Sequence, residues 1–150
     1  MRTRIGGRTS SFCLASGWTL AELLMVVAIL GIISALAIPT YQQQQRKARR
    51  SDARAALLQL QFDQTRYRSA HESFAGSSLE LGWPSDHSAQ HFYRLHMTEV
   101  STDGYMVEAF PLGPQAADID CTPMRLVWRD AATVVYSSGP SLDSDPAQCW

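Results

Sequence analysis

The sequence predicts an α+β fold in which a long N-terminal α-helix, membrane-spanning in its first half, packs on a roughly four-stranded antiparallel sheet. Three features predict it: an apolar run over residues 18–38, a segment without glycine or proline over 41–68, and short apolar stretches between turn residues over 92–136. A helix followed by several strands is the order of an α+β domain. The helix should therefore cover one face of the sheet.

The apolar run is long enough to cross a membrane. About 20 helical residues, each rising about 1.5 Å, span the roughly 30 Å hydrocarbon layer. Glu22 is the single charged residue in the run, and a carboxylate inside an apolar span costs about 2.5–3.5 kcal/mol or more. Such a group usually has a partner, which favours assembly within a membrane. The alternative is a plain signal anchor with Glu22 at the lipid headgroups.

The following segment, residues 41–68, should continue as an amphipathic helix. Small and apolar residues recur at three- and four-residue steps, and they predict the stripe that packs on the sheet: Ala48, Ser51, Ala55, Leu58 and Phe62, widened by Leu57 and Leu60.

A basic cluster lies at the start of this segment and comprises Arg46, Lys47, Arg49, Arg50 and Arg54. We interpret it as a solvated helix face with Asp52 and Asp63 as counterions. Contact with lipid headgroups is an alternative, and contact with DNA is a weaker one.

The remaining residues predict a loop and two hairpins. Gly76, Gly82 and Pro84 mark residues 69–90 as a loop. The predicted strands cover residues 92–100 and 105–110 around Thr102-Asp103-Gly104, and 124–128 and 133–136 around Arg129-Asp130.

The N-terminal residues resemble the class III signal and first helix of type IV pilins. The resemblance runs from Gly17 through Trp18-Thr19-Leu20-Ala21-Glu22-Leu23 to Ile38-Pro39-Thr40-Tyr41. It implies cleavage between Gly17 and Trp18 by a prepilin peptidase on the cytoplasmic face, followed by N-methylation of Trp18. The family usually has phenylalanine at the position of Trp18.

The resemblance also implies the domain organisation and two assembly residues. Residues 1–17 would be a prepilin leader, 18–39 the transmembrane and assembly helix, and 40–150 a periplasmic globular head, with the helix continuing over 40–68 and the sheet and a disulfide-bounded loop over 90–150. Glu22 would pair with the new Trp18 amine of a neighbouring subunit. A self-contained pair within one helix is the alternative, because residues four apart share a helix face. Pro39 would fall within a helix that continues.

The distribution of basic residues conflicts with the orientation that the leader implies. Basic residues lie on both sides of the span, and the larger group follows it, so the positive-inside rule alone would place the head in the cytoplasm. We give precedence to the leader, and to the cysteines of the head, which suit an oxidising compartment. The predicted location is the inner membrane, crossed once with the N-terminus cytoplasmic and the head periplasmic, and then the pilus.

Cys121 and Cys149 remain after loss of a leader that contains Cys13. A disulfide bond between them would close a loop and, by the chain-entropy model, stabilise the fold by about 3.5 kcal/mol. Two free thiols or half of a metal site are the alternatives, and a metal would need two further ligands. The four histidines form no recognisable motif with these cysteines.

A looser resemblance covers the C-terminal region. Ala109-Phe110-Pro111-Leu112-Gly113-Pro114-Gln115, Asp118, Cys121 and Cys149-Trp150 are similar to the head of a minor pilin subfamily often called PilE-like. It implies a four-stranded antiparallel sheet closed by a disulfide-bounded loop.

No catalytic pattern is recognisable, so the sequence predicts neither an enzyme nor a cofactor. There is no Gly-x-Ser-x-Gly, phosphate loop or metal-binding helix motif. Asp118, Asp120, Asp143 and Asp145 match no calcium loop, and we interpret them as solvated. Without the three leader arginines the chain has ten basic and fourteen acidic side chains, a formal net charge of −4, which argues against strong nucleic-acid binding through the net field.

The sequence therefore predicts a minor type IV pilin that supports pilus biogenesis, twitching motility, adhesion or DNA uptake. Its expected partners are other pilin subunits, the prepilin peptidase, the inner membrane and the pilus assembly platform. The alternatives are a type II secretion pseudopilin and a DNA-binding receptor pilin.

Overall fold

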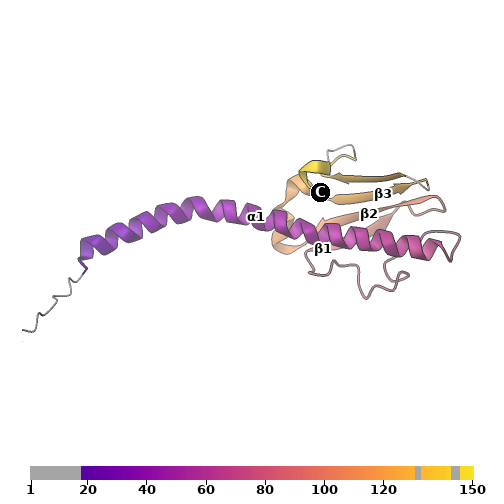
Figure 1. Ribbon diagram of the computed structural model, residues 1–150, viewed down its shortest axis with the longest axis horizontal. Helices are drawn as coiled ribbons and strands as arrows, with labels where there is room; N and C mark the ends of the chain where they lie inside the picture. Colours follow the sequence, from indigo (N-terminus) through magenta and orange to yellow (C-terminus); the bar gives the residue numbers. More distant parts are fainter. Residues whose placement is uncertain (1–17, 131–132, 143–145) are drawn as a thin grey trace, which may run out of the picture. The chain divides into compact units, whose positions relative to one another are not determined.

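The computed structural model describes residues 18–130, 133–142 and 146–150, and they form the predicted α+β architecture (Figure 1). The regular elements are α1 (Leu20–Arg68), β1 (Tyr93–Thr98), β2 (Gly104–Pro111), β3 (Met124–Arg129) and β4 (Thr133–Ser138), with three short 3-10 helices, η1 (Gly113–Ala117), η2 (Ile119–Cys121) and η3 (Pro146–Gln148). The chain divides into two compact units, Met1–Pro39 and Thr40–Trp150.

The described part of the first unit is helical from Leu20 onward, and its side chains are exposed throughout. The helix is long and apolar enough to cross a membrane by length and composition. It continues through Pro39 into the second unit. The simple helix stop that a proline could impose is therefore absent here.

The sheet is an antiparallel meander of order β1-β2-β3-β4, close to the predicted hairpins. The tight connection between β1 and β2 places Gly104 opposite Arg129 of β3, where a Cβ atom would collide with the Trp128 carbonyl oxygen. Glycine is therefore required at this point of the predicted Thr-Asp-Gly turn.

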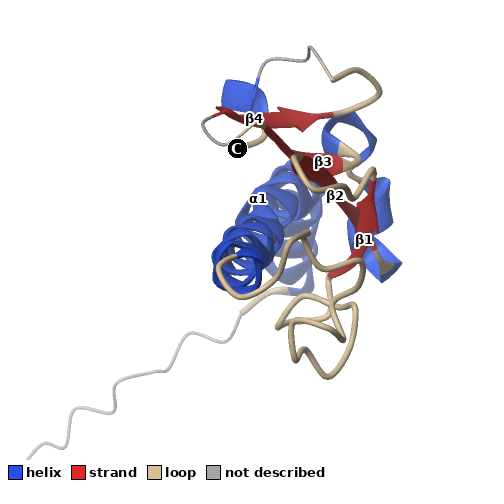
Figure 2. Ribbon diagram, turned by 90° about the vertical axis from the view of Figure 1, so that its right-hand side faces the viewer, coloured by secondary structure: helices blue, strands red, loops and turns tan. Residues whose placement is uncertain are grey.

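The core lies between one face of the sheet and the part of α1 that belongs to the second unit (Figure 2). The side chains that fill it are Ala53, Ala56, Leu57 and Leu60 from the helix, Tyr93 and Leu95 from β1, Tyr105, Val107 and Ala109 from β2, and Met124 and Leu126 from β3. Trp83, Trp128 and Trp150 pack at its margin.

The predicted helix stripe is wrong in phase. Ala48, Ser51 and Ala55 are exposed, and the larger Leu58 and Phe62 have exposed fractions of 48% and 64%. The buried face is the opposite one, because the loop over 69–90 adds polar partners to that side. Leu57 and Leu60, which were predicted to lie at the margin of the stripe, are fully buried and lie at the centre of the observed buried face.

The loop over residues 69–90 is held to α1 by buried polar side chains. The Gln64 side-chain amide accepts from the Ala75 N–H and donates to the Ala75 carbonyl, both at 2.8 Å. Asp63 accepts from the Trp83 indole at 2.9 Å. The end of the loop then pairs with the outer edge of β1, where His87 and Arg94 form an isolated antiparallel bridge.

Candidate functional site

The start of α1 is organised around Thr19. The Glu22 N–H donates to Thr19 Oγ1 at 3.2 Å, and the Leu23 N–H donates to the Thr19 carbonyl at 3.2 Å. Thr19 is thus the N-cap and Glu22 the third helical residue, the spacing of a capping box. Sequence reasoning missed this cap, although the Thr-x-x-Glu pattern indicates it.

Glu22 therefore has a local role beside the assembly role predicted for it. A carboxylate in the first turn is favoured by the partial positive charge of the helix N-terminus. Trp18, four residues earlier, is exposed, and in the uncut chain its nitrogen is a peptide N–H without charge. Gly17 and the rest of the predicted leader lie outside the described residues, so cleavage and N-methylation stay predictions.

The apolar face of the first unit has room for close neighbours. Nothing within 4 Å surrounds the position that a Gly31 Cβ would take. Small residues in membrane helices let another helix approach closely, and Gly31 and Ser34 provide such a place. No contact within the described chain uses it.

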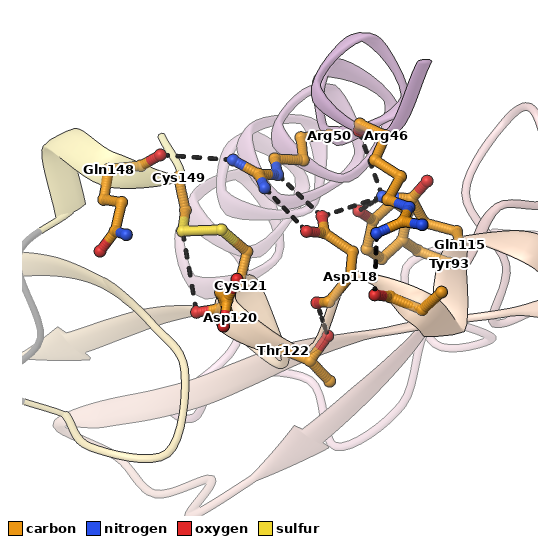
Figure 3. A network of polar contacts seen from close by, with 11 residues as sticks. Arg46, Arg50, Tyr93, Gln115, Asp118, Asp120, Cys121, Thr122, Gln148 and Cys149 are labelled. Atoms are coloured by element: carbon orange, nitrogen blue, oxygen red, sulfur yellow. Dashed lines mark hydrogen bonds and ion pairs between the residues drawn. A yellow bond between two sulfur atoms is a disulfide. The ribbon is translucent and has the colours of Figure 1, made fainter. Parts of the chain in front are cut away.

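The end of the head near Arg46 is built around a buried ion pair, shown in Figure 3. Arg50 of α1 donates to both carboxylate oxygens of Asp118, each at 2.7 Å. Asp118 directly follows η1, and its backbone carbonyl accepts from the Thr122 hydroxyl at 2.6 Å. The hydrogen bonds that Arg50 donates to the Asp118 carboxylate raise the Arg50 pKa above its usual value.

Gln115 and Tyr93 extend this network to one side of the ion pair (Figure 3). The Gln115 amide nitrogen lies 3.0 Å from both the Tyr93 hydroxyl and an Asp118 oxygen, and 3.2 Å from the Arg46 carbonyl. Tyr93 is almost wholly buried, and that burial raises the pKa of its phenol to about 12. The network fixes η1 against the helix.

A disulfide joins Cys121, at the end of η2, to Cys149 near the C-terminus, with the two Cα atoms 5.7 Å apart. Arg50 reaches the same tail, since its Nη1 atom donates to the Gln148 carbonyl at 3.3 Å. One arginine thus connects α1, the η1–η2 turn and the tail (Figure 3). The tail also packs on β4, where the Trp150 indole donates to the Ser137 carbonyl at 3.0 Å.

Two expectations about charges are wrong. Asp118 is buried rather than solvated, because Arg50 and Gln115 satisfy its carboxylate. Asp52 and Asp63 are not counterions of the basic cluster: Asp52 accepts from the Ser88 hydroxyl at 2.5 Å and from the Gln90 N–H at 3.1 Å, while Asp63 accepts from Trp83. The helix uses them to hold the loop.

Within the described residues, no group of three or more His, Cys, Asp or Glu side chains is arranged to hold a metal ion. Asp120 is exposed, and Asp143 and Asp145 lie outside those residues. The described site therefore offers packing surfaces and fixed charges.

Comparison with known proteins agrees with this arrangement. Residues 39–125 match the family described as type IV minor pilin ComP, DNA uptake sequence receptor. The chain belongs to this family of type IV minor pilins. The N-terminal motif predicted a type IV pilin and the looser C-terminal resemblance a minor pilin. Both predictions are confirmed by this match, which covers most of the head.

Two curated relatives are pilus proteins. The chain is 30% identical over 105 residues to the type IV major pilin protein PilA of Myxococcus xanthus (strain DK1622), which covers 70% of this minor pilin and 47% of the relative. It is 35% identical over 69 residues to a fimbrial protein of Neisseria meningitidis serogroup B (strain ATCC BAA-335 / MC58), covering 46% and 41%. The chain thus spans less than half the length of these relatives.

Proposed function

We propose that this minor pilin is a structural subunit of a type IV pilus, which enters the filament through residues 18–39 and presents residues 40–150 on its surface. The observation that carries the proposal is the contrast between the two units. The apolar helix has exposed side chains on every face, whereas the head buries its own core. An exposed apolar helix requires lipid first and sibling helices afterwards.

Processing and topology follow the N-terminal motif. A prepilin peptidase would cut between Gly17 and Trp18 on the cytoplasmic face and methylate the Trp18 amine. The head would lie in the periplasm until the pilus assembly platform extracts the subunit from the inner membrane. The Cys121–Cys149 disulfide supports a periplasmic head, because such bonds persist in oxidising compartments. Residues 1–17, 18–39 and 40–150 would then be leader, assembly helix and head.

Glu22 would set the register of the subunit in the filament. Cleavage creates a positive amine on Trp18, and the Glu22 carboxylate of a neighbouring subunit would neutralise it in the apolar filament core. Pro39 would mark the end of the buried assembly helix. In this role the chain carries out no bond chemistry, and it needs no cofactor or metal.

N-terminal analysis of purified filaments tests the proposal. Mass spectrometry should find a chain that starts at N-methylated Trp18. Filaments in which the arginine-bearing leader is still attached would contradict it. The names of both relatives favour a pilus over a type II secretion pseudopilus, and finding the subunit only in secretion-system complexes would reverse that preference.

DNA binding is a second candidate function, favoured by the description of the matched family as a DNA uptake sequence receptor and by the location of the match over the head. Of the α1 cations without an ion pair to a described carboxylate, Arg46, Arg49 and Arg68 donate side-chain hydrogen bonds to neutral groups. The side chains of Lys47, Arg54 and Arg66 make neither kind of contact among the described residues, and they could contact phosphates. The formal net charge, −1 for the full chain and −4 without residues 1–17, opposes non-specific binding, so any DNA contact would be local.

Binding of duplex DNA to the full chain in detergent, measured across salt concentrations, tests this candidate. Each phosphate contact contributes about −0.9 to the slope of log affinity against log salt. Arg54→Ala and Arg66→Ala should each lower the slope by about one. Arg94→Ala is the matched control, because Arg94 already pairs with Asp86. Binding that does not respond to salt, or no binding, would remove the receptor function.

A further inference from the structure

Charge is unevenly distributed along the head. From Arg46 to Arg54 the sequence has five basic side chains and one carboxylate, whereas from Ala55 to Trp150 it has five basic and twelve acidic side chains. The first turns of α1 in the head are thus strongly positive, and the rest of the head is negative.

The positive segment lies close to the start of the head. Arg46 follows Thr40 by six residues, which places it about 9 Å farther along the helix axis. The headgroup layer on each side of a bilayer is about 5–8 Å thick. If residues 18–39 span the membrane, Arg46 and Lys47 stand at the outer surface of the headgroups.

An exposed apolar side chain belongs to the rigid turn that Arg46 contacts. Arg46 Nη1 donates to the Ala117 carbonyl at 3.3 Å, so the η1–η2 turn lies against α1 near Arg46 (Figure 3). Ile119 on this turn has an exposed fraction of 73%. The Arg50–Asp118 pair and the disulfide hold the turn in place, so Ile119 cannot turn inward to hide.

We propose that Arg46, Lys47 and Ile119, here called the head base, dock on anionic phospholipid headgroups while the subunit waits in the membrane. Lys47 is exposed and forms no ion pair with a described carboxylate, and Arg46 bonds a carbonyl, which leaves its charge uncompensated. Basic residues next to a membrane are attracted to anionic lipid, and an exposed aliphatic side chain beside them adds apolar contact with the interface.

The acidic remainder of the head strengthens this orientation. An anionic surface repels the carboxylates of residues 55–150 and attracts the head base, so the head would rest on its base with the sheet held away from lipid. Docking also gives a role to Arg46 and Lys47, two of the five basic residues after the span that conflict with the positive-inside rule. It rests on the proposed function only in requiring that residues 18–39 cross the membrane.

Hydrogen exchange of the full chain in lipid nanodiscs tests the proposal. One set of discs contains phosphatidylcholine alone, and the other contains equal parts of phosphatidylcholine and phosphatidylglycerol. Peptides covering residues 112–120 should exchange about fivefold more slowly in the anionic discs, the factor that one surface-bound cation provides. Molar salt should abolish the difference, because it shortens the screening length to about 3 Å.

Two variants and a control locate the effect. Lys47→Glu and Ile119→Ser change exposed side chains, so the head should fold, and each should reduce the difference between the two lipid compositions. Arg129→Gln removes an exposed cation at the end of β3 and should leave the difference intact. Near-ultraviolet circular dichroism verifies that all three variants keep the native packing.

Equal exchange in the two kinds of disc would overturn the proposal. So would protection of the same peptides by duplex DNA on phosphatidylcholine discs without any effect of phosphatidylglycerol, which would assign the basic group to nucleic acid. A chain that does not co-purify with the discs would overturn the span and the docking together.

Discussion

The two parts of α1 are continuous in backbone but differ in what stabilises them. Over residues 20–39 the side chains are apolar and exposed, so their stability depends on lipid or on other subunits. Over residues 40–68 one face is closed by the sheet and by the loop that follows, within the same chain. The same secondary structure is therefore packed within the chain in its second half and open to lipid or to other chains in its first.

Glu22→Gln should break the first half of this comparison with the largest effect. Removing one member of a buried ion pair costs about 3–5 kcal/mol, so incorporation into filaments should fall about a hundredfold or more. The head should keep its thermal stability, since Glu22 belongs to the other unit. Immunoblots of sheared pili against membrane fractions measure the incorporated share.

The control for this prediction separates charge from capping. Glutamine at the third helical position still suits a capping box, whereas Thr19→Val removes the cap oxygen that accepts from the Glu22 N–H and keeps the carboxylate. Thr19→Val should assemble nearly as the native chain does. Normal assembly of Glu22→Gln with failure of Thr19→Val would show that capping, not pairing, is the contribution of Glu22.

A pair of adjacent leucines sharpens the second half of the comparison. Leu57 is fully buried and Leu58 is 48% exposed. Leu57→Ala should lower the free energy of unfolding of the head by about 2–5 kcal/mol through lost burial and a cavity, whereas Leu58→Ala should change it by about 0.5 kcal/mol or less. Denaturant titration of the full chain in detergent measures the unfolding free energy of both variants. Equal losses would mean that Leu58 is buried as deeply as Leu57, as the predicted stripe requires.

The disulfide should have a slightly smaller effect, confined to the head. The paired substitution Cys121→Ser with Cys149→Ser should lower the free energy of unfolding by about 2–4 kcal/mol, because it frees the tail from the η1–η2 turn. Thermal melts with and without a reducing agent measure the change. A double variant that melts with the native protein would show that the Arg50 network alone holds the turn.

Alkaline pH should lower the stability of the head progressively. Burial raises the pKa of Tyr93 to about 12, and it also raises the pKa of Tyr105, whereas unfolded tyrosine ionises near pH 10. Between these values the unfolded chain binds fewer protons, so stability falls as pH rises, by about 1.4 kcal/mol per pH unit for each tyrosine. Stability below pH 10 is unaffected by these groups.

Two variants can show which tyrosine causes the fall in stability with pH, in denaturant titrations from about pH 9 to about pH 12. Tyr93→Phe should remove the share of one tyrosine. Tyr41→Phe changes an exposed ring and should keep the full slope. An unchanged slope in Tyr93→Phe would mean that the buried phenol is not the group that titrates.

The sequence predicted most of the fold because its signals are local. The helix over residues 20–68 and the four strands follow from composition, spacing and turn residues such as Thr102-Asp103-Gly104. The buried face of the helix was not predictable in the same way. Both faces carry apolar or small residues, and the choice depends on distant polar partners such as Ala75 for Gln64 and Ser88 for Asp52.

The site shows the same division. The candidate residues Gly17, Trp18, Glu22 and Pro39 came from a contiguous motif, while the network around Asp118 joins α1 to residues 68 positions away. Spacing alone could not identify Arg50 as the partner of Asp118, because four other basic residues lie within the same cluster. Thr19 was available from its pattern and was missed.

Subunits that crowd against their own copies risk aggregation through open strand edges. In this head the segment before β1 covers the outer edge of β1. The Ser88 N–H donates to the Tyr93 carbonyl at 2.9 Å, and the Leu95 N–H donates to the Asp86 carbonyl. An edge already engaged in this way offers no template to a neighbouring chain. Heads that crowd together would then meet the β1 side through side chains, and any strand pairing between copies would be confined to the β4 side.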